Sequence, residues 1–136
     1  MERVPAVDGL FTEEGGGQLL ATRCASCESV YFPKANVCHN PNCEESKIED
    51  FAFGGRGTLW SYSIQDFPPP APHKFDEPYQ IYALGVVDFP VGVRLMGQMS
   101  IDDVEKVQIG SEVELVIEPL FHEDGKAFTS WKFKQL

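Results

Sequence analysis

The chain has 136 residues, the length of one average domain or of two very small domains joined end to end. Its composition, 43% hydrophobic and 12% aromatic, is typical of a folded globular protein and excludes a disordered one. The formal net charge is −10. A uniformly acidic surface repels nucleic acid, which binds to clustered lysine and arginine, so we expect no nucleic-acid partner.

No apolar segment of the sequence is long enough to cross a bilayer. The first nine residues lack the continuous apolar stretch of a secretory signal. We therefore expect a cytoplasmic protein with no membrane partner. In that reducing compartment the four cysteines are not expected to form disulfides.

All four cysteines lie close together in the sequence, at Cys24, Cys27, Cys38 and Cys43. The spacing Cys-x2-Cys-x10-Cys-x4-Cys places two tight turns so that four thiolates can converge tetrahedrally on one ion, as Zn²⁺ prefers. The residues between them include too few apolar side chains to form a core alone. We therefore predict a structural zinc site with these four ligands. The alternatives are free or disulfide-paired cysteines, an iron site, and a Cys3His site that uses His39.

The predicted zinc site also limits the chemistry of the chain. Four protein ligands leave no open coordination position, and with every cysteine bound to metal no thiol nucleophile remains. The three histidines, His39, His73 and His122, stand in no recognisable nucleophile or triad motif, and we interpret each as an exposed loop residue. We therefore predict no catalytic residue in this chain.

Five segments after Cys43 have the alternating apolar pattern and the β-branched or aromatic content of strands. They cover approximately residues 57–66, 80–89, 93–100, 112–118 and 127–134. In the first segment Trp60, Tyr62 and Ile64 share one face, and we assign the aromatic side chains to the core. The second segment is apolar on both faces, as expected of a central strand.

The connection between the first two predicted strands is long, from Phe67 to Pro78, and holds five of the ten prolines. Because proline fixes φ and has no N–H to donate, we predict an extended, semi-rigid arm here and exclude an interior strand. Loops of this length are usually functional or disordered. This segment, residues 67–78, is called the arm below.

Residues 102–107 begin with acidic side chains, which a helix N-terminus favours, and Gly110 follows as a stop signal. One or two helical turns are therefore predicted between the third and fourth strands. Five strands with a short helix at that place are the element order of an OB-fold, a partly open Greek-key barrel in which the loop between strands 1 and 2 often binds the ligand. A small sandwich is the alternative, because alternation alone does not determine closure.

The predicted fold class is therefore mainly β, with an N-terminal zinc ribbon followed by a five-stranded OB-fold barrel. The domain boundaries that we expect are an N-terminal extension over residues 1–18, the zinc ribbon over residues 19–50 and the OB-fold over residues 51–136.

The order of these features resembles a known family. The motifs that carry the resemblance are Leu19-Leu20-Ala21-Thr22-Arg23-Cys24-x-x-Cys27, Tyr31-Phe32-Pro33 before the second cysteine pair, Gly55-x-Gly57-Thr58-Leu59-Trp60-Ser61-Tyr62, Pro78-Tyr79, and Val107-x-Ile109-Gly110-x-x-Val113. Together they resemble the small proteins with a rubredoxin-like zinc ribbon followed by an acyl-CoA-associated OB-fold. The resemblance extends from about Phe11 to the C-terminus, and its specificity lies in the combination. The x4 spacing of the second cysteine pair departs from the x2 that is more usual there.

Members of that family are small partners of thiolase-like or ketosynthase-like proteins that make or break carbon–carbon bonds in CoA thioesters. Their settings include archaeal acetoacetyl-CoA thiolase assemblies, steroid side-chain aldolase complexes and the benzoylsuccinyl-CoA thiolase of anaerobic toluene degradation. This chain most resembles the last kind, a stand-alone small subunit with no fused dehydratase domain. The resemblance implies a non-catalytic accessory subunit of a hetero-oligomeric thiolase-type complex, with the reactive cysteine on the larger partner.

Within such a complex we predict that the arm packs on the thiolase-like partner near the acyl-CoA entrance. The expected contacts are two aromatic anchors, a proline and a small cationic spot, namely Phe67, Pro69, His73, Lys74 and Phe75. Lys74 is the expected phosphate contact. A solvated spacer is the alternative role for the arm.

Two other classes of function compete with this one. Zinc ribbons and OB-folds also bind nucleic acid, and Trp60, Tyr62 or Phe133 could stack on bases, although the net charge of −10 disfavours it. An independent small hydrolase or isomerase is disfavoured because the sequence shows no convergent polar constellation.

Overall fold

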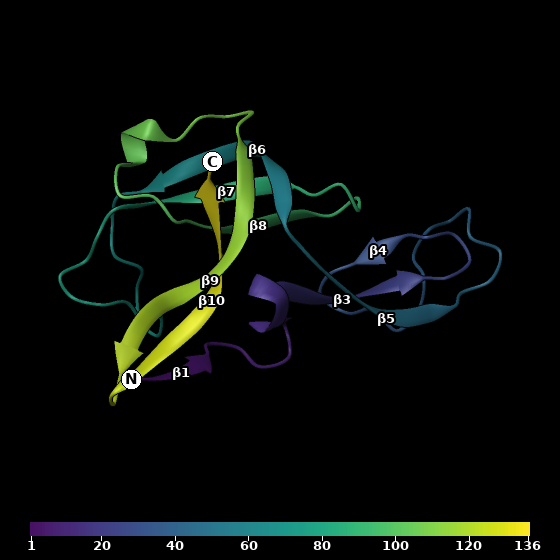
Figure 1. Cartoon of the computed structure of the whole chain (residues 1–136), viewed down its shortest axis with the longest axis horizontal. Coiled ribbons are helices and arrows are strands. Elements are labelled where there is room, and N and C mark those ends of the chain that lie inside the picture. Colours follow the sequence, from purple (N-terminus) through teal and green to yellow (C-terminus); the bar gives the residue numbers. More distant parts are fainter.

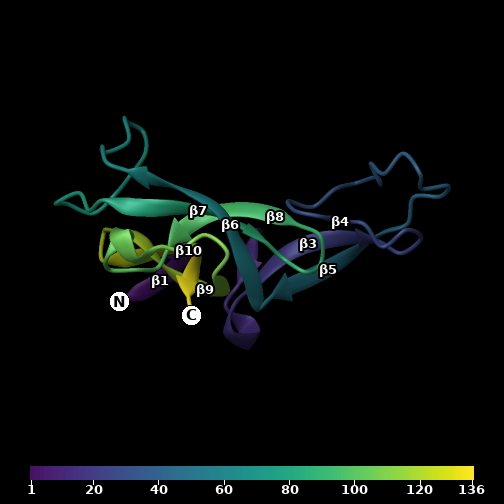
Figure 2. The ribbon, with the colours of Figure 1, turned by 90° about the horizontal axis from the view of Figure 1, so that it is seen from above.

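The computed structural model covers the whole chain, residues 1–136. Its regular structure consists of ten strands and two short 3-10 turns, with no α-helix. No helix is therefore long or apolar enough to span a membrane. The molecule is elongated, with a barrel at one end and a smaller ribbon of strands projecting from it (Figure 1). The view from above shows the same division (Figure 2).

The barrel consists of five strands, β6 (Arg56–Gln65), β7 (Tyr82–Asp88), β8 (Arg94–Met99), β9 (Glu112–Glu123) and β10 (Lys126–Gln135). They pair in the order β10-β8-β7-β6-β9, and pairing of β9 with β10 closes the barrel. β8 and β10 are parallel, and the other neighbours are antiparallel. This is the predicted OB-fold topology, and the closure excludes the sandwich.

The predicted helix between the third and fourth strands is a single 3-10 turn, η2 (Val104–Lys106). The side chain of Asp103 caps it by accepting a hydrogen bond of 3.0 Å from the backbone N–H of Glu105. The turn thus has the expected place and start signal, but it is shorter than the sequence suggested.

The ribbon contains four short strands, β2 (Phe11–Thr12), β3 (Gln18–Cys24), β4 (Val30–Tyr31) and β5 (Ile48–Gly54). A 3-10 turn, η1 (Glu14–Gly16), lies between β2 and β3. β3 is central and pairs antiparallel with each of the other three. A further strand, β1 (Glu2–Pro5), pairs parallel with β10. Residues that the sequence indicated only as an extension therefore contribute a strand to the edge of the barrel sheet.

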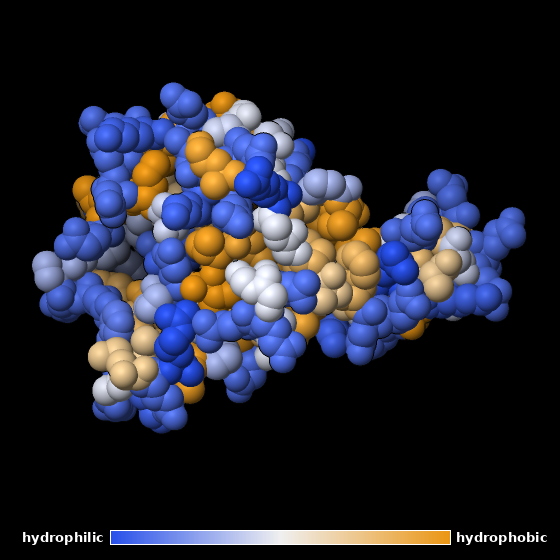
Figure 3. Space-filling model, viewed as in Figure 1, coloured by the Kyte–Doolittle hydropathy of each residue, from blue (hydrophilic) through white to orange (hydrophobic).

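A single hydrophobic core runs through both parts of the molecule. Leu59, Val87 and Phe133 are fully buried inside the barrel, and Leu19 and Ala21 are equally buried at the base of the ribbon. Phe53 of β5 joins the two, since its ring lies 5.4 Å from that of Phe89. Apolar side chains are also visible on the surface where ribbon and barrel meet (Figure 3). The base of the ribbon is thus packed against the barrel.

At the end of β5 the backbone of Gly54 closely approaches that of Gly17, the residue before β3. A Cβ atom on Gly54 would lie 2.5 Å from the carbonyl oxygen of Gly17, closer than real Cβ contacts allow. Only glycine fits here, because any side chain would push the end of β5 away from the start of β3, its partner strand in the ribbon.

Trp60 lies outside the core, and the sequence-based assignment was wrong for this residue. The register of β6 against β7 pairs Leu59 with Val87 and Ser61 with Val86, so Trp60 is the extra residue of a β-bulge. Its side chain is 52% exposed, and the guanidinium of Arg94 lies 3.8 Å from the ring centroid. Strict alternation assumes an unbroken ladder, and the bulge breaks it.

The two tryptophans should therefore differ in their contributions to stability. Trp131 touches the rings of Phe11 and Phe32 and donates a hydrogen bond to the carbonyl of Met96, so Trp131→Ala should lower the free energy of unfolding by about 3 kcal/mol. Trp60→Ala loses only exposed stacking on Arg94 and should cost less than about 1 kcal/mol. Urea unfolding followed by circular dichroism measures both, and equal losses would contradict the bulge.

Candidate functional site

The four cysteines meet at the end of the ribbon that is far from the barrel. Cys24 closes β3 and Cys27 lies in the turn after it, whereas Cys38 and Cys43 lie in the loop between β4 and β5. All four sulfur atoms lie within 4.8 Å of one another, with 3.7 Å between Cys24 and Cys43 and 3.4 Å between Cys27 and Cys38. Tetrahedral Zn–S bonds of about 2.3 Å require sulfur atoms about 3.8 Å apart. The cluster therefore has the size of a four-thiolate zinc site.

Local hydrogen bonds shape the first turn. The backbone N–H of Cys24 donates to the carbonyl of Ser29 at 2.9 Å, and that of Glu28 donates to the carbonyl of Cys24 at 2.7 Å. Glu28 has a φ of 66°, so the chain reverses through the left-handed region just after Cys27.

The x4 spacing of the second cysteine pair is accommodated by an asparagine turn. Asn40 accepts from the backbone N–H of Cys43 through its carbonyl at 3.0 Å, and through its side chain from the N–H of Asn42 at 3.0 Å. The two additional residues therefore form a compact turn, and the two thiols still reach the cluster.

The crowded thiols have opposed pKa shifts. Hydrogen bonds from backbone N–H groups, first that of Lys47, lower the pKa of Cys24 to about 6. Burial, together with the neighbouring thiols, raises the pKa of Cys43 to about 12. Four thiolates this close repel one another, and a divalent cation that binds all of them supplies the charge that keeps them ionised.

His39 is not part of the cluster, which contains only cysteines. Its ring packs edge-on against Tyr31, with 5.5 Å between the centroids. The hydroxyl of Tyr31 lies 3.3 Å from the sulfur of Cys38 and accepts a hydrogen bond from the backbone N–H of His39. His39 therefore supports the second cysteine turn from outside, and the structure does not favour the Cys3His alternative.

The arm folds back against the hairpin of β9 and β10, at the side of the barrel opposite the ribbon (Figure 1). Both carboxylate oxygens of Asp76 are engaged by His122, one with its backbone N–H at 2.6 Å and one with its ring Nδ1 at 2.5 Å. These contacts with His122 hold the pKa of Asp76 below its usual value. Lys74 pairs with Glu123 at 2.6 Å. The interpretation of His122 as a loop residue was wrong, because it lies in β9, and its contacts with Asp76 anchor the arm.

A cavity of about 510 Å³ lies between the folded arm and the outer face of the barrel. Four of the five predicted contact residues line it: Pro69, His73, Lys74 and Phe75. The fifth, Phe67, is 83% exposed and is not part of its lining. The barrel side includes Tyr82, Gln98 and Lys132, which the sequence analysis did not select. Lys132 alternates with buried Phe133, so its outward direction was predictable, but the arm that covers it was not.

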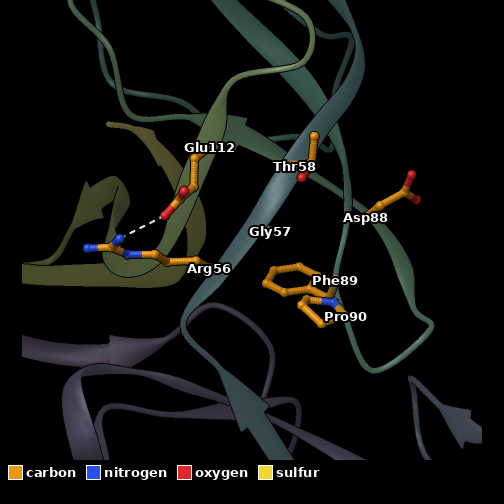
Figure 4. Close-up of a pocket in the computed structure, with 7 residues that line it drawn as sticks. All are labelled: Arg56, Gly57, Thr58, Asp88, Phe89, Pro90 and Glu112. Atoms are coloured by element: carbon orange, nitrogen blue, oxygen red, sulfur yellow. Dashed lines mark hydrogen bonds and ion pairs between the residues drawn. The ribbon is translucent and has the colours of Figure 1, made fainter.

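A second, more open depression lies between β6, β7 and β9 (Figure 4). Its only cationic side chain, Arg56, is paired with Glu112 at 2.7 Å. Phe89 and Pro90 lie beside Gly57 at its centre (Figure 4). Asp88 is likewise paired, with Arg94 at 2.6 Å, so the charged groups of this depression are engaged and its lining is only slightly apolar.

The fold and the cysteine cluster together define a zinc-ribbon and OB-fold protein, and comparison with known families agrees. Residues 17–49 match the rubredoxin-like zinc ribbon domain of ChsH2, and residues 52–118 match the C-terminal OB-fold domain of ChsH2. The zinc is thus a structural cofactor, as predicted. The chain belongs to the family of DUF35 domain-containing scaffold proteins.

Relatives match along most of their length. A DUF35 domain-containing scaffold protein of Methanothermobacter thermautotrophicus is 31% identical over 119 residues, covering 85% of this chain and 84% of the relative. The benzoylsuccinyl-CoA thiolase subunit BbsA of Thauera aromatica is 29% identical over 115 residues, covering 84% of this chain and 74% of that subunit. A solved structure, the Ltp2-ChsH2(DUF35) aldolase, has the same fold with a TM-score of 0.65 and 23% identity, covering 87% of this chain and 84% of that one.

Removal of the metal should unfold only the outer part of the ribbon. We expect about one zinc per chain, and chelation or Cys24→Ser should abolish amide protection over residues 24–47, because zinc binding and the folding of such loops are one equilibrium. The barrel and the base of the ribbon should keep their protection through the buried contacts of Leu19 and Phe53. Metal analysis and hydrogen exchange test this. Unchanged exchange after complete chelation would contradict it.

Proposed function

We propose that this protein is a non-catalytic accessory subunit of a thiolase-type complex that acts on acyl-CoA. The observation that carries the proposal is the match of both modules, ribbon and barrel, to one family of scaffold proteins. One relative is named as a subunit of a thiolase, and a structure of the same fold is named as an aldolase complex. The first name describes one subunit of an enzyme, and the second joins ChsH2 with a further component, Ltp2.

The chemistry of the chain supports a non-catalytic role. Thiolase chemistry uses an activated cysteine, and all four thiols here converge in one cluster. Four ligands close the coordination sphere of the zinc, so the metal has no position for a substrate. The reacting groups for cleavage or formation of the carbon–carbon bond are therefore assigned to the partner.

The predicted contacts of the arm also belong to this proposal. Phe67 is 83% exposed, and a free aromatic side chain of this kind is suited to insert into a pocket of the partner. Lys74 would have to exchange Glu123 for a CoA phosphate, and an exposed ion pair of this kind costs less than about 1 kcal/mol to break. We place Phe67, Pro69, His73, Lys74 and Phe75 at the interface where acyl-CoA enters. The setting that we propose for this complex is anaerobic toluene degradation in the cytoplasm.

The alternative of nucleic-acid binding has no support from the aromatic side chains. Phe133 is fully buried, Tyr62 packs against the core, and the ring of Trp60 is covered on one face by Arg94. Trp60 is half exposed, but the Arg94 above its ring is paired with Asp88 at 2.6 Å, so none of the three residues offers a stacking surface beside an unpaired cation.

The proposal predicts stable capture of a thiolase-like subunit from native cells. The tagged, zinc-loaded chain should co-purify with it, and mass spectrometry should identify the partner. In an assay of CoA thioester cleavage the chain alone should be inactive, whereas the reconstituted pair should turn over. Activity of partner-free protein, or capture of nucleic acid in place of a protein, would contradict the proposal.

The arm should matter for assembly and much less for folding. Replacement of residues 67–78 by a four-residue turn should leave zinc content and melting temperature nearly unchanged, because the arm contributes no residue to the core. Binding of the partner should weaken about tenfold or more, or the apparent KM for the CoA substrate should rise by that factor. Phe67→Ala should weaken binding in the same direction, and Ile109→Ala, an exposed apolar residue outside the arm, is the matched control. Parent-like assembly and turnover would show that the arm is a spacer.

A further inference from the structure

Lys132 occupies an unusual position for a lysine. It lies on β10, opposite Gln98 of β8, and its side chain points to the outer face of the barrel, under the arm. Only 12% of its side chain is exposed, whereas the lysines that form the other ion pairs are 45% exposed or more. The ammonium group therefore lies in the wall of the cavity, with most of its methylene chain buried.

The ammonium of Lys132 has no hydrogen-bond partner within the protein. Its one ionic neighbour, Oε1 of Glu118, is 4.0 Å away, and both oxygens of that carboxylate lie within 2.9 Å of the hydroxyl of Ser100. Burial lowers the pKa of Lys132, which Glu118 and Asp76 only partly oppose. No acceptor of the protein lies within hydrogen-bond distance of this ammonium, so its three donors are free for an acceptor that enters the cavity.

The other charges around the cavity are already engaged. Lys74 is held by Glu123 at 2.6 Å, and Asp76 uses both oxygens on His122. A ligand can therefore bind Lys132 without displacing a hydrogen-bonded carboxylate, whereas Lys74 would first have to separate from Glu123. An anion placed against it would be attracted by a charge that is poorly solvated and weakly compensated.

The remaining wall of the cavity is aromatic and apolar. The rings of Phe75 and Tyr79 lie 5.2 Å apart, and those of Tyr79 and Tyr82 lie 6.4 Å apart. The hydroxyl of Tyr79 donates a hydrogen bond to the carbonyl of Gln65 at 2.8 Å. The ring of Tyr79, and not its hydroxyl, is therefore available to a ligand. Leu120 completes this side. The volume of about 510 Å³ is typical of small-molecule sites.

We propose that this cavity is a binding site for a small ligand that carries an oxyanion, a carboxylate or a phosphate, on an apolar or aromatic body. Lys132 binds the oxyanion, and the aromatic wall of Phe75, Tyr79 and Tyr82 holds the body. The site shares Phe75 with the interface proposed above, but it is formed within one chain, so binding to it can be measured without the partner. Its failure and the failure of complex formation are therefore measured separately.

The test uses the full-length, zinc-loaded protein. Benzoate and phenyl phosphate are titrated against it, with inorganic phosphate as the anion without a body and benzyl alcohol as the body without an anion. The ¹⁵N resonance of the Lys132 ammonium and the backbone amides of Tyr82 and Gln98 report binding. We expect saturable shifts with benzoate or phenyl phosphate, and binding at least about tenfold weaker for the two single-feature probes. The stronger of the two aromatic anions identifies carboxylate or phosphate as the preferred group.

Variants assign the binding to the lysine. Lys132→Met should lower the affinity about tenfold or more, and Lys132→Arg should retain it within about threefold. Lys134→Met removes an equal charge from the same strand at an exposed position and should have no effect. Should Lys132→Met fail to fold, the ¹⁵N shift of the Lys132 ammonium in the parent protein still shows whether the anion binds at this lysine. No saturable shift with either aromatic anion, or loss of binding in Lys74→Met but not in Lys132→Met, would overturn the proposal.

Discussion

The contact between Phe53 of the ribbon and Phe89 of the barrel is the interaction on which the rest of the structure depends. Phe53 is 6% exposed and also meets the rings of Phe32 and Phe51. Through it the ribbon and the barrel share one hydrophobic core, and Gly54 permits the close backbone approach beside it. A ribbon of this size buries too little apolar surface to fold alone. Packing on the barrel stabilises the base of the ribbon, and zinc stabilises the cysteine-containing loops at its far end.

This division separates the two functional parts of the molecule in space. The cysteine cluster lies at the far end of the ribbon, and the arm with its cavity lies at the opposite side of the barrel (Figure 1). The shared core holds the two ends in a defined relation, because packed aromatic rings resist bending. A rigid, elongated body with a metal-bound ribbon at one end and a cavity between arm and barrel at the other is suited to the role of a scaffold within a larger complex.

Charge explains why so little of the surface is available to anions. The chain has 21 acidic against 11 basic side chains, and most of the basic ones are paired at the surface, as Arg56 is with Glu112 and Arg94 with Asp88. Such exposed pairs contribute little to stability, but they neutralise the cations. Lys132 differs because only 12% of its side chain is exposed and its nearest carboxylate, that of Glu118, lies 4.0 Å away, beyond hydrogen-bond distance. The arm forms one wall of the cavity, and this weakly compensated cation lies in the opposite wall.

Local signals in the sequence determined the elements and the metal site. The positions of Cys24, Cys27, Cys38 and Cys43 predicted the zinc cluster, because tight turns and thiolate chemistry depend on neighbours in the chain. Alternating apolar residues likewise located all five barrel strands. Only the tertiary structure decided the rest. The bulge that turns Trp60 outward, the pairing of β1 with β10, and the contact of Asp76 with His122 join residues that are distant in sequence or depend on strand register. Lys132 became a candidate for binding only when the arm, more than fifty residues away in the chain, folded over it, because burial is a property of the whole fold.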